Sequence, residues 1–396
     1  MTESGAKQEK MKTPQREDRF ESARVNGIAR QERNSRTSGR SVVGSMKTPV
    51  VFSAAILVSS LALALLVAVG TFAQSTQPWH LPDVPWAFPV RAKAQPAIDA
   101  RTGLIHIPDS AKTYTQDQID DHMNPPDWFP DEHAPMPRVV AHGGGTDVLG
   151  CASCHLASGL GHPESAYLAG ESAEYIERQL SDFKAHLRMG EGMNDITRNL
   201  TDEDAKEAAE WFSKLPPKPW EKVVETDRVP KTFVNESLMR MPLPGGGDEP
   251  IGERIIELPQ DIARAESRDP HSGFIAYVPT GSLAKGKEFV NTGGNGKSIQ
   301  CIVCHGPNLG GLGTVPAIAG HSPMYLFRQL YYFKDGSRHG SMAALMKGVV
   351  AQMTQDDMLA IAAYVASLPP GIRDSAEVVT AEPAPASLDA SAKKSK

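Results

Sequence analysis

The sequence predicts an all-α protein that contains one small helical domain twice. Residues 151–188 align without a gap with residues 301–338, and 14 of these 38 positions are identical. Within both stretches, apolar residues recur at the spacing of an amphipathic helix. All four cysteines of the 396-residue chain fall in this repeat, which excludes a dense disulfide framework. We therefore expect two tandem domains, at 139–217 and 281–370, in a protein of ordinary globular composition.

Each copy of the repeat is expected to form two main helices. Ser172 and Ser322 stand at the N-cap of the first helix, and Pro323 follows at the first helical position in the second copy. Thr201 and Thr354 stand at the N-cap of the second helix, before acidic residues that suit the positive end of the helix dipole. A pair of consecutive prolines then ends each second helix.

Two copies of the motif Cys-x-x-Cys-His use every cysteine: Cys151, Cys154 and His155 in the first, and Cys301, Cys304 and His305 in the second. This motif is the attachment site of c-type haem. Two thiols separated by two residues can reach both vinyl groups of the porphyrin and form thioethers, and the next residue presents its imidazole to the iron. The chain is therefore predicted to bind two haem c groups covalently, with His155 and His305 as iron ligands.

Two other uses of such cysteines fit the sequence less well. A zinc site built from two cysteine pairs usually keeps the pairs about 15–20 residues apart and needs no histidine after each pair. A thioredoxin-like redox pair would sit in a βαβ pattern, which the sequence does not show. The repeat therefore favours haem over both alternatives.

A methionine in each copy is the candidate for the second axial ligand of the iron, the ligand that raises the potential of a cytochrome c. Met193 and Met346 each lie seven residues before an aligned apolar residue in front of the second helix. Both are expected on a loop that crosses the far face of the haem. One of them could instead be core filler. The rival ligands are Met189, Met342, His162, His186, His321 and His339.

An uncharged apolar run occupies residues 50–72, which is long enough to cross a bilayer at about 1.5 Å per residue. Basic residues dominate before it and acidic residues after it, which places the N-terminus in the cytoplasm and the rest in the bacterial periplasm, anchored to the inner membrane. The alternative is a cleaved signal peptide that starts at Met46 and is cut before Gln74, which would leave a soluble periplasmic protein. Both alternatives export residues 74–396.

Charge is distributed unevenly along the chain. Residues 1–49 hold 11 Lys/Arg and 6 Asp/Glu and are predicted to be a disordered basic leader, or a mis-assigned start, while residues 73–396 hold 30 basic and 41 acidic groups. The acidic body argues against a nucleic-acid partner. It favours docking to basic surfaces of redox proteins, or merely aids solubility.

Three further segments lie outside the repeats. The extension 73–138 is rich in Pro, Trp and Asp, and the connector 218–280 has strand-like pieces at 222–225 and 254–257. We expect both to be irregular but ordered segments that wrap the two domains; flexible linkers are the alternative. The tail 371–396 is predicted to be disordered.

The motif followed by Ala-Gly, Tyr, Gln-Leu, Phe-Lys, Met and a Thr-capped helix resembles the two-haem bacterial cytochromes c of the c4 type, over roughly 139–217 and 281–370. The resemblance implies two class I cytochrome c folds packed against each other, with His155 and Met193 on one iron and His305 and Met346 on the other. It also implies an electron carrier between periplasmic or membrane-bound redox enzymes. The long extension and connector depart from the family, whose members have a short linker.

Three functions follow from these patterns. The first is a non-catalytic carrier that passes single electrons from a dehydrogenase to an oxidase or another acceptor. The second is the cytochrome subunit of a membrane-associated dehydrogenase complex, in which the extension and connector form the interface. The third is an enzyme, such as a two-haem peroxidase or a sulfur-compound dehydrogenase. An enzyme needs an open iron position, so the two methionines argue against the third function.

Overall fold

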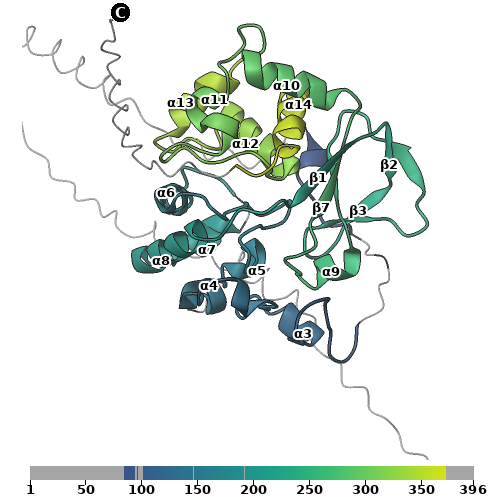
Figure 1. The fold of residues 1–396 in the computed structure, drawn as a ribbon, viewed down its shortest axis with the longest axis vertical. Coiled ribbons are helices and arrows are strands. Elements are labelled where there is room, and N and C mark those ends of the chain that lie inside the picture. The colour runs from purple at the N-terminus through teal and green to yellow at the C-terminus, as the bar shows by residue number, and fades with distance from the viewer. Residues whose placement is uncertain (1–83, 94–95, 97–100, 146, 191, 372–396) are drawn as a thin grey trace, which may run out of the picture. The chain divides into compact units, whose positions relative to one another are not determined.

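The computed structural model describes residues 84–93, 96, 101–145, 147–190 and 192–371 (Figure 1). The leader 1–49, the apolar run 50–72 and residues 372–396 of the tail lie outside the described residues, so the expectations for them stay predictions. None of the helices in the described ranges is long and apolar enough to span a bilayer.

The first copy of the repeat folds into short helices around an apolar core. Its helices are α4 (Arg138–His142), α5 (Ala152–His155), α6 (Ala173–Lys184), α7 (Met193–Arg198) and α8 (Asp202–Ser213). Both predicted N-caps are confirmed, because Ser172 and Thr201 accept hydrogen bonds from backbone N–H groups one turn ahead, at 3.2 and 3.0 Å. Phe212 on α8 is 1% exposed and belongs to this core.

The second copy folds in the same way. Its helices are α10 (Ser282–Thr292), α11 (Ile302–His305), the 3₁₀ turn η3 (Pro307–Leu309), α12 (Pro323–Asp335), α13 (Ala343–Val350) and α14 (Gln355–Ala366). The N-caps Ser322 and Thr354 and the position of Pro323 are confirmed. A Cβ added at Gly286 would lie 1.9 Å from the carbonyl oxygen of Ala360, so only glycine lets α10 and α14 approach this closely.

The connector contradicts the prediction of an all-α protein. It contains three small sheets and one short helix: β1 (Glu221–Glu225), β2 (Arg228–Pro230), β3 (Thr232–Val234), β4 (Arg240–Pro242), β5 (Asp248–Pro250), β6 (Ile256–Pro259), α9 (Ile262–Glu266) and β7 (Phe274–Val278). In the largest sheet the strand order is β1-β7-β6, with β7 parallel to β1 and antiparallel to β6. The strand-like piece at 222–225 lies within β1, whereas the piece at 254–257 only overlaps β6. The connector was therefore wrongly described as irregular.

The described part of the extension packs on both domains and on the connector. The 3₁₀ turn η1 (Pro85–Ala87) joins the core of the second domain, where the rings of Trp86 and Phe327 lie 4.6 Å apart. Farther along come α3 (Gln116–Ile119) and η2 (Pro130–Glu132). The indole of Trp128, 2% exposed, donates a 2.8 Å hydrogen bond to the carbonyl of Ser267 in the connector.

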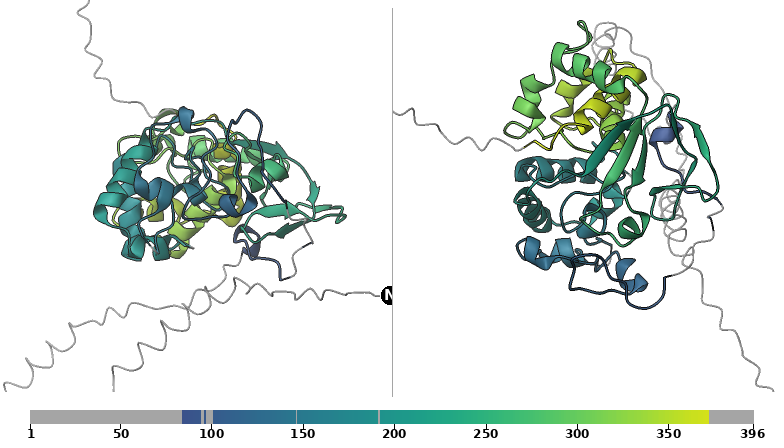
Figure 2. Two further views of the ribbon diagram at one scale, coloured as in Figure 1. Left: turned by 90° about the horizontal axis from the view of Figure 1, so that it is seen from below. Right: turned by 45° about the vertical axis from the view of Figure 1, so that its right-hand side comes forward.

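The two copies of the repeat meet through equivalent residues. An isolated antiparallel bridge pairs Arg188 with Arg338, which occupy the same position in the two copies. On either side of it, the N–H of Met189 donates to the carbonyl of Ser337 at 2.9 Å, and the N–H of His339 donates to the carbonyl of Leu187 at 2.8 Å. Figure 2 shows the helices of the two copies as separate groups, with the strands beside them in its right-hand view. The contact between the copies is therefore nearly symmetric.

Candidate haem sites

Each cysteine motif lies on a single helical turn. Cys151 caps α5, and Cys154 and His155 follow three and four residues later, so the three side chains share one face of the turn. Cys301 caps α11 in the same way. All four thiols are free of disulfides. This donor set, two thiols and one imidazole on one face, fits the two vinyl groups and the iron of haem c.

Both motif histidines are held in the same orientation by a backbone carbonyl. Nδ1 of His155 lies 2.8 Å from the carbonyl oxygen of Ala166, and Nδ1 of His305 lies 2.9 Å from that of Pro316. A carbonyl only accepts, so Nδ1 carries the proton and Nε2 keeps its lone pair. Burial lowers the pKa of both imidazoles, which keeps them neutral. Each ring therefore offers Nε2 as a metal ligand, with the outer nitrogen fixed as in other metal-binding histidines.

Burial also governs the thiols. It raises the pKa of Cys151 to about 12 and that of Cys301 to about 11, since the thiolate loses hydration inside the protein. Before attachment these groups are therefore thiols at neutral pH and make little use of thiolate chemistry. This state disfavours a redox-active pair of the thioredoxin kind.

The two candidate methionines lie on short helices rather than on loops, which corrects the sequence prediction. Met193 is the first residue of α7 and is partly buried. Met346 lies inside α13, partly buried against the core of the second domain. They are therefore not placed in the same way within their helices, although they align in the repeat.

The six rival ligands differ in exposure. His186 and His339 are exposed and Met342 is 42% exposed, whereas Met189 and His162 are partly buried. His321 is buried and stacks on Tyr167 of the first domain at 4.5 Å between ring centroids. Burial lowers the pKa of both His162 and His321 to about 3. Both imidazoles are therefore neutral at pH 7.

The two residues between the cysteines are covered by other parts of the chain in the first motif and exposed in the second. Ser153, between the two cysteines of the first motif, is 4% exposed and lies 2.6 Å from Nδ1 of His122; its carbonyl accepts from Nη1 of Arg268 at 2.6 Å. In the second motif, Ile302 and Val303 are 44% and 62% exposed. The sequence predicted that the extension and the connector wrap the two domains, but not that they cover the first motif, because these contacts join residues that are distant in the chain and carry no local signal.

A depression beside each motif shows the same contrast. In the second domain it is a groove with about 410 Å³ of free space, lined among others by Pro307, Asn308, Leu368 and Pro369. The equivalent residues of the first domain line a cleft with only about 20 Å³ of free space, little more than one water molecule needs: Ala157, Ser158, Leu215 and Pro216.

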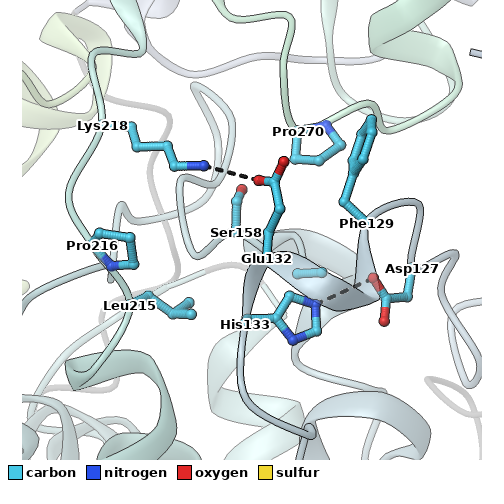
Figure 3. A pocket seen from close by; sticks show the side chains of 10 residues that line it. Asp127, Phe129, Glu132, His133, Ser158, Leu215, Pro216, Lys218 and Pro270 are labelled. Carbon is cyan, nitrogen blue, oxygen red and sulfur yellow. Dashed lines mark hydrogen bonds and ion pairs between the residues drawn. The ribbon is translucent and has the colours of Figure 1, made fainter. Parts of the chain in front are cut away.

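Residues of the extension and the connector close the cleft in the first domain (Figure 3). Glu132 accepts from Nζ of Lys218 at 2.9 Å, and Nε2 of His133 lies 3.2 Å from the carboxylate of Asp127. The hydrogen bond with Asp127 is the main cause that raises the pKa of His133. The contact between Glu132 and Lys218 ties the extension to the connector, so we assign this cleft a structural role.

Comparisons with known proteins agree with this geometry. The family model described as Cytochrome c matches residues 283–369. Cytochrome c-554(548) of Halomonas halodenitrificans is 36% identical over 75 residues, which cover 19% of this chain and 90% of that protein. A protein of Thiomonas intermedia named thiosulfate dehydrogenase electron acceptor is 28% identical over 228 residues, 56% of this chain and 80% of that protein.

Two-haem relatives and solved structures are also similar. Cytochrome c4 of Pseudomonas aeruginosa is 23% identical over 239 residues, 58% of this chain and 92% of that protein. The structure of thiosulfate dehydrogenase (TsdBA) from Marichromatium purpuratum matches 59% of this chain, but only 39% of its own, at 24% identity and a TM-score of 0.40. So low a score supports no functional argument. The sequence matches are stronger evidence. Together with the motif geometry, they show that the chain belongs to the cytochrome c family, whose haem c is covalently bound.

Proposed function

We propose that the chain is a periplasmic electron carrier that binds two haem c groups, one in each copy of the repeat, and passes single electrons between redox proteins. The observation that carries this proposal is the matched pair of motif histidines. Each is held through Nδ1 by a carbonyl that lies 11 residues farther along the chain, which leaves Nε2 as the nitrogen that can bind a metal. Two independent sites with the same donor set and the same orientation support two haems.

Haem, when bound, supplies an iron that cycles between the ferrous and ferric states. The chain's own residues do the rest: Cys151 and Cys154 hold one group and Cys301 and Cys304 the other, while His155 and His305 present Nε2. Met193 and Met346 are proposed as the second axial ligands. If a histidine and a methionine both bound each iron, neither iron would keep a position for substrate, which suits a carrier rather than an enzyme.

A second candidate is narrower: the cytochrome that accepts electrons from a dehydrogenase of a sulfur oxyanion such as thiosulfate. The names of the relatives from Thiomonas intermedia and Stutzerimonas stutzeri, which are 28% and 24% identical to this chain, favour it. In this function the open face of the second motif is the side on which the dehydrogenase would dock. Stopped-flow reduction of the purified cytochrome by thiosulfate dehydrogenase with thiosulfate tests this candidate, and no reduction would reject it.

The number of haems is tested by mass. The full chain is expressed with a c-type cytochrome maturation system, and the intact mass should exceed the polypeptide mass by two haems. The variants Cys151→Ala/Cys154→Ala and Cys301→Ala/Cys304→Ala should each keep one haem. A wild-type chain with one haem or none would refute the proposal.

The carrier function and the location are tested separately. The reduced protein should bind carbon monoxide slowly at both haems, and rapid binding would indicate an open iron and an enzyme. Cell fractionation with N-terminal sequencing of the mature protein locates it and shows whether 50–72 is kept as an anchor or removed before Gln74. Recovery in the cytoplasm would contradict the proposed location.

A further inference from the structure

The extension fills the cleft of the first domain with the segment 127–135 (Figure 3). The ring of His133 lies edge-on to that of Trp211, with centroids 5.3 Å apart, and the indole Nε1 of Trp211 donates a 3.0 Å hydrogen bond to the carbonyl of Ala134. The backbone of His133 is extended, with φ −148° and ψ 162°, and residues 130 and 135 are prolines. The first domain therefore holds an extended, proline-flanked segment through an aromatic side chain that binds a backbone carbonyl.

The equivalent groove of the second domain has about 410 Å³ of free space, so no described segment of the chain fills it. Leu215 of the first cleft is 6% exposed, whereas the equivalent Leu368 is only half-buried and Pro307 is exposed. Ile302 is one of the described lining residues, but the cysteines and the histidine of the second motif are not. The groove is therefore a surface feature beside the motif and is separate from the haem donors.

Tyr364 occupies in α14 the position that Trp211 has in α8. Both residues stand ten positions after the threonine N-cap of their helix, Thr354 or Thr201. Tyr364 lines the groove and is half-buried, and within the described ranges its hydroxyl makes no hydrogen bond. A phenol O–H is a donor, as an indole N–H is. The groove therefore presents a free donor from the helix position that binds a backbone carbonyl in the first domain.

The charges around the two sites define what the second groove can take. Lys218, which binds Glu132 in the first domain, is replaced at the aligned position by Gly371, and none of the described residues that line the second groove is charged. A carboxylate buried there would lose hydration without a partner. The complementary ligand is therefore uncharged on the side that faces the groove. Extended proline-rich segments suit such a groove, because they lose little conformational freedom on binding and pack on aromatic side chains.

We propose that this groove is the docking site for an extended, proline-flanked segment of a partner protein. An uncharged aromatic side chain of that segment packs on the ring of Tyr364, and the next backbone carbonyl accepts a hydrogen bond from the Tyr364 hydroxyl, as His133 and Ala134 do with the indole in the first domain. Ile302 follows Cys301 in the chain, so the bound segment lies beside the second haem attachment motif. This contact selects a partner by its sequence, in contrast to the attraction between net charges.

Isothermal titration calorimetry at pH 8 tests the proposal with the full-length holoprotein and a synthetic peptide as the probe. The peptide has the sequence of residues 129–137 with Asp131→Asn and Glu132→Gln, and its histidine is neutral at this pH. One peptide should bind per chain, because the first cleft already holds this segment.

Two variants of the groove and one control locate the binding. Tyr364→Phe should weaken binding roughly 3- to 10-fold through the loss of one hydrogen bond. Asn291 is exposed and lines the groove, so the indole of Asn291→Trp should block the peptide. Tyr277→Phe, which removes a hydroxyl from β7 outside both sites, is the matched control and should change nothing.

No binding to the wild type, or equal binding to the wild type and either groove variant, would overturn the proposal. A peptide of residues 372–396 that binds the same groove more tightly would assign it to the chain's own tail. A dimer that Asn291→Trp dissociates in sedimentation velocity would assign it to a second copy of the chain, and either assignment overturns the proposal. Intact mass reports the haem content of each sample, so a failure of the two-haem function is seen separately from a failure of the groove.

Discussion

His155 and His305 show how a single backbone contact can prepare a residue for its ligand. In both copies the carbonyl that accepts from Nδ1 belongs to a residue 11 positions later, so the loop after the motif sets the direction of the ring. Fixing the proton on Nδ1 also raises the basicity of the nitrogen that faces the metal. This contact occurs in both copies of the repeat but could not be predicted from the sequence. Its acceptor is a backbone carbonyl, which every residue has whatever its side chain.

Met346→Ala should lower the potential of the second haem and open its iron to carbon monoxide. Axial ligands set haem potentials over a range of roughly 0.8 V, so the shift should be readily measured by spectroelectrochemistry. Met342→Ala is the matched control, since Met342 is the nearest rival and is 42% exposed. If Met342→Ala changes the spectrum and Met346→Ala does not, the proposed ligand is wrong.

At the scale of single residues, the cysteine motifs, the helix N-caps and the proline at the first helical position could be predicted, because their signals are local. Ser172, Ser322, Thr201 and Thr354 each act on a backbone N–H within one turn, which spacing alone reveals. The burial of His321 could not be predicted, because its partner Tyr167 belongs to the other copy.

At the scale of elements, the connector differs most from the prediction, because it contains sheets. The strand-like piece at 222–225 indicated β1, but nothing local indicated that β7, some fifty residues later, would pair with it in parallel. The sheet brings Glu221 of β1 and Glu257 of β6 to the same face on either side of β7, because their partners there are Phe274 and Ala276. Two carboxyl groups thus share a buried site.

Burial of this pair raises the pKa of Glu257 to about 8, with a neighbouring Glu164 acting in the same direction and Ser322 and Arg328 opposing it. The pKa of Glu221 is also raised, first by burial and then by the charge of Glu257. In the unfolded chain these groups ionise near their ordinary pKa of 4.5. The folded protein therefore binds more protons, and its stability should fall as pH rises from about 4.5 to about 8.

The substitution Glu257→Gln should remove the contribution of Glu257 to this loss of stability with rising pH. The free energy of unfolding of the wild type should decline relative to the variant by up to about 1.4 kcal/mol per pH unit across that window, so the variant should be the more stable protein at pH 8. Denaturant unfolding of the ferric holoprotein at several pH values measures it. The exposed Glu253→Gln should follow the wild type. Parallel curves for Glu257→Gln and wild type would show that Glu257 ionises normally.

At the scale of the whole molecule, the contact between the two copies is symmetric, but the segments packed around the copies are not. The bridge between Arg188 and Arg338 joins equivalent residues, whereas the extension and the connector fill most of the cleft in the first domain and the groove of the second keeps about 410 Å³ of free space. Sequence repetition could predict the first property. It could not predict the second, which depends on where non-repeated segments pack.

The acidic body should be visible in electron exchange with small charged reagents. Residues 73–396 hold 41 acidic and 30 basic groups, so the oxidation rate of the reduced protein by the cation hexaammineruthenium(III) should fall as salt rises. The rate with the anion hexacyanoferrate(III) should rise under the same conditions. Stopped-flow spectroscopy measures both. The reverse pair of trends would show that basic groups near the haems outweigh the net charge.

The cover over the first motif imposes an order on assembly. Ser153 lies beneath Arg268, a residue synthesised 115 positions later, while Val303 in the second motif stays exposed in the finished fold. We therefore expect thioether formation at Cys154 to be easier before the connector docks over Ser153, whereas no such cover lies over Val303 in the second motif. When haem is scarce, molecules that fold before attachment should carry haem at the second motif more often than at the first.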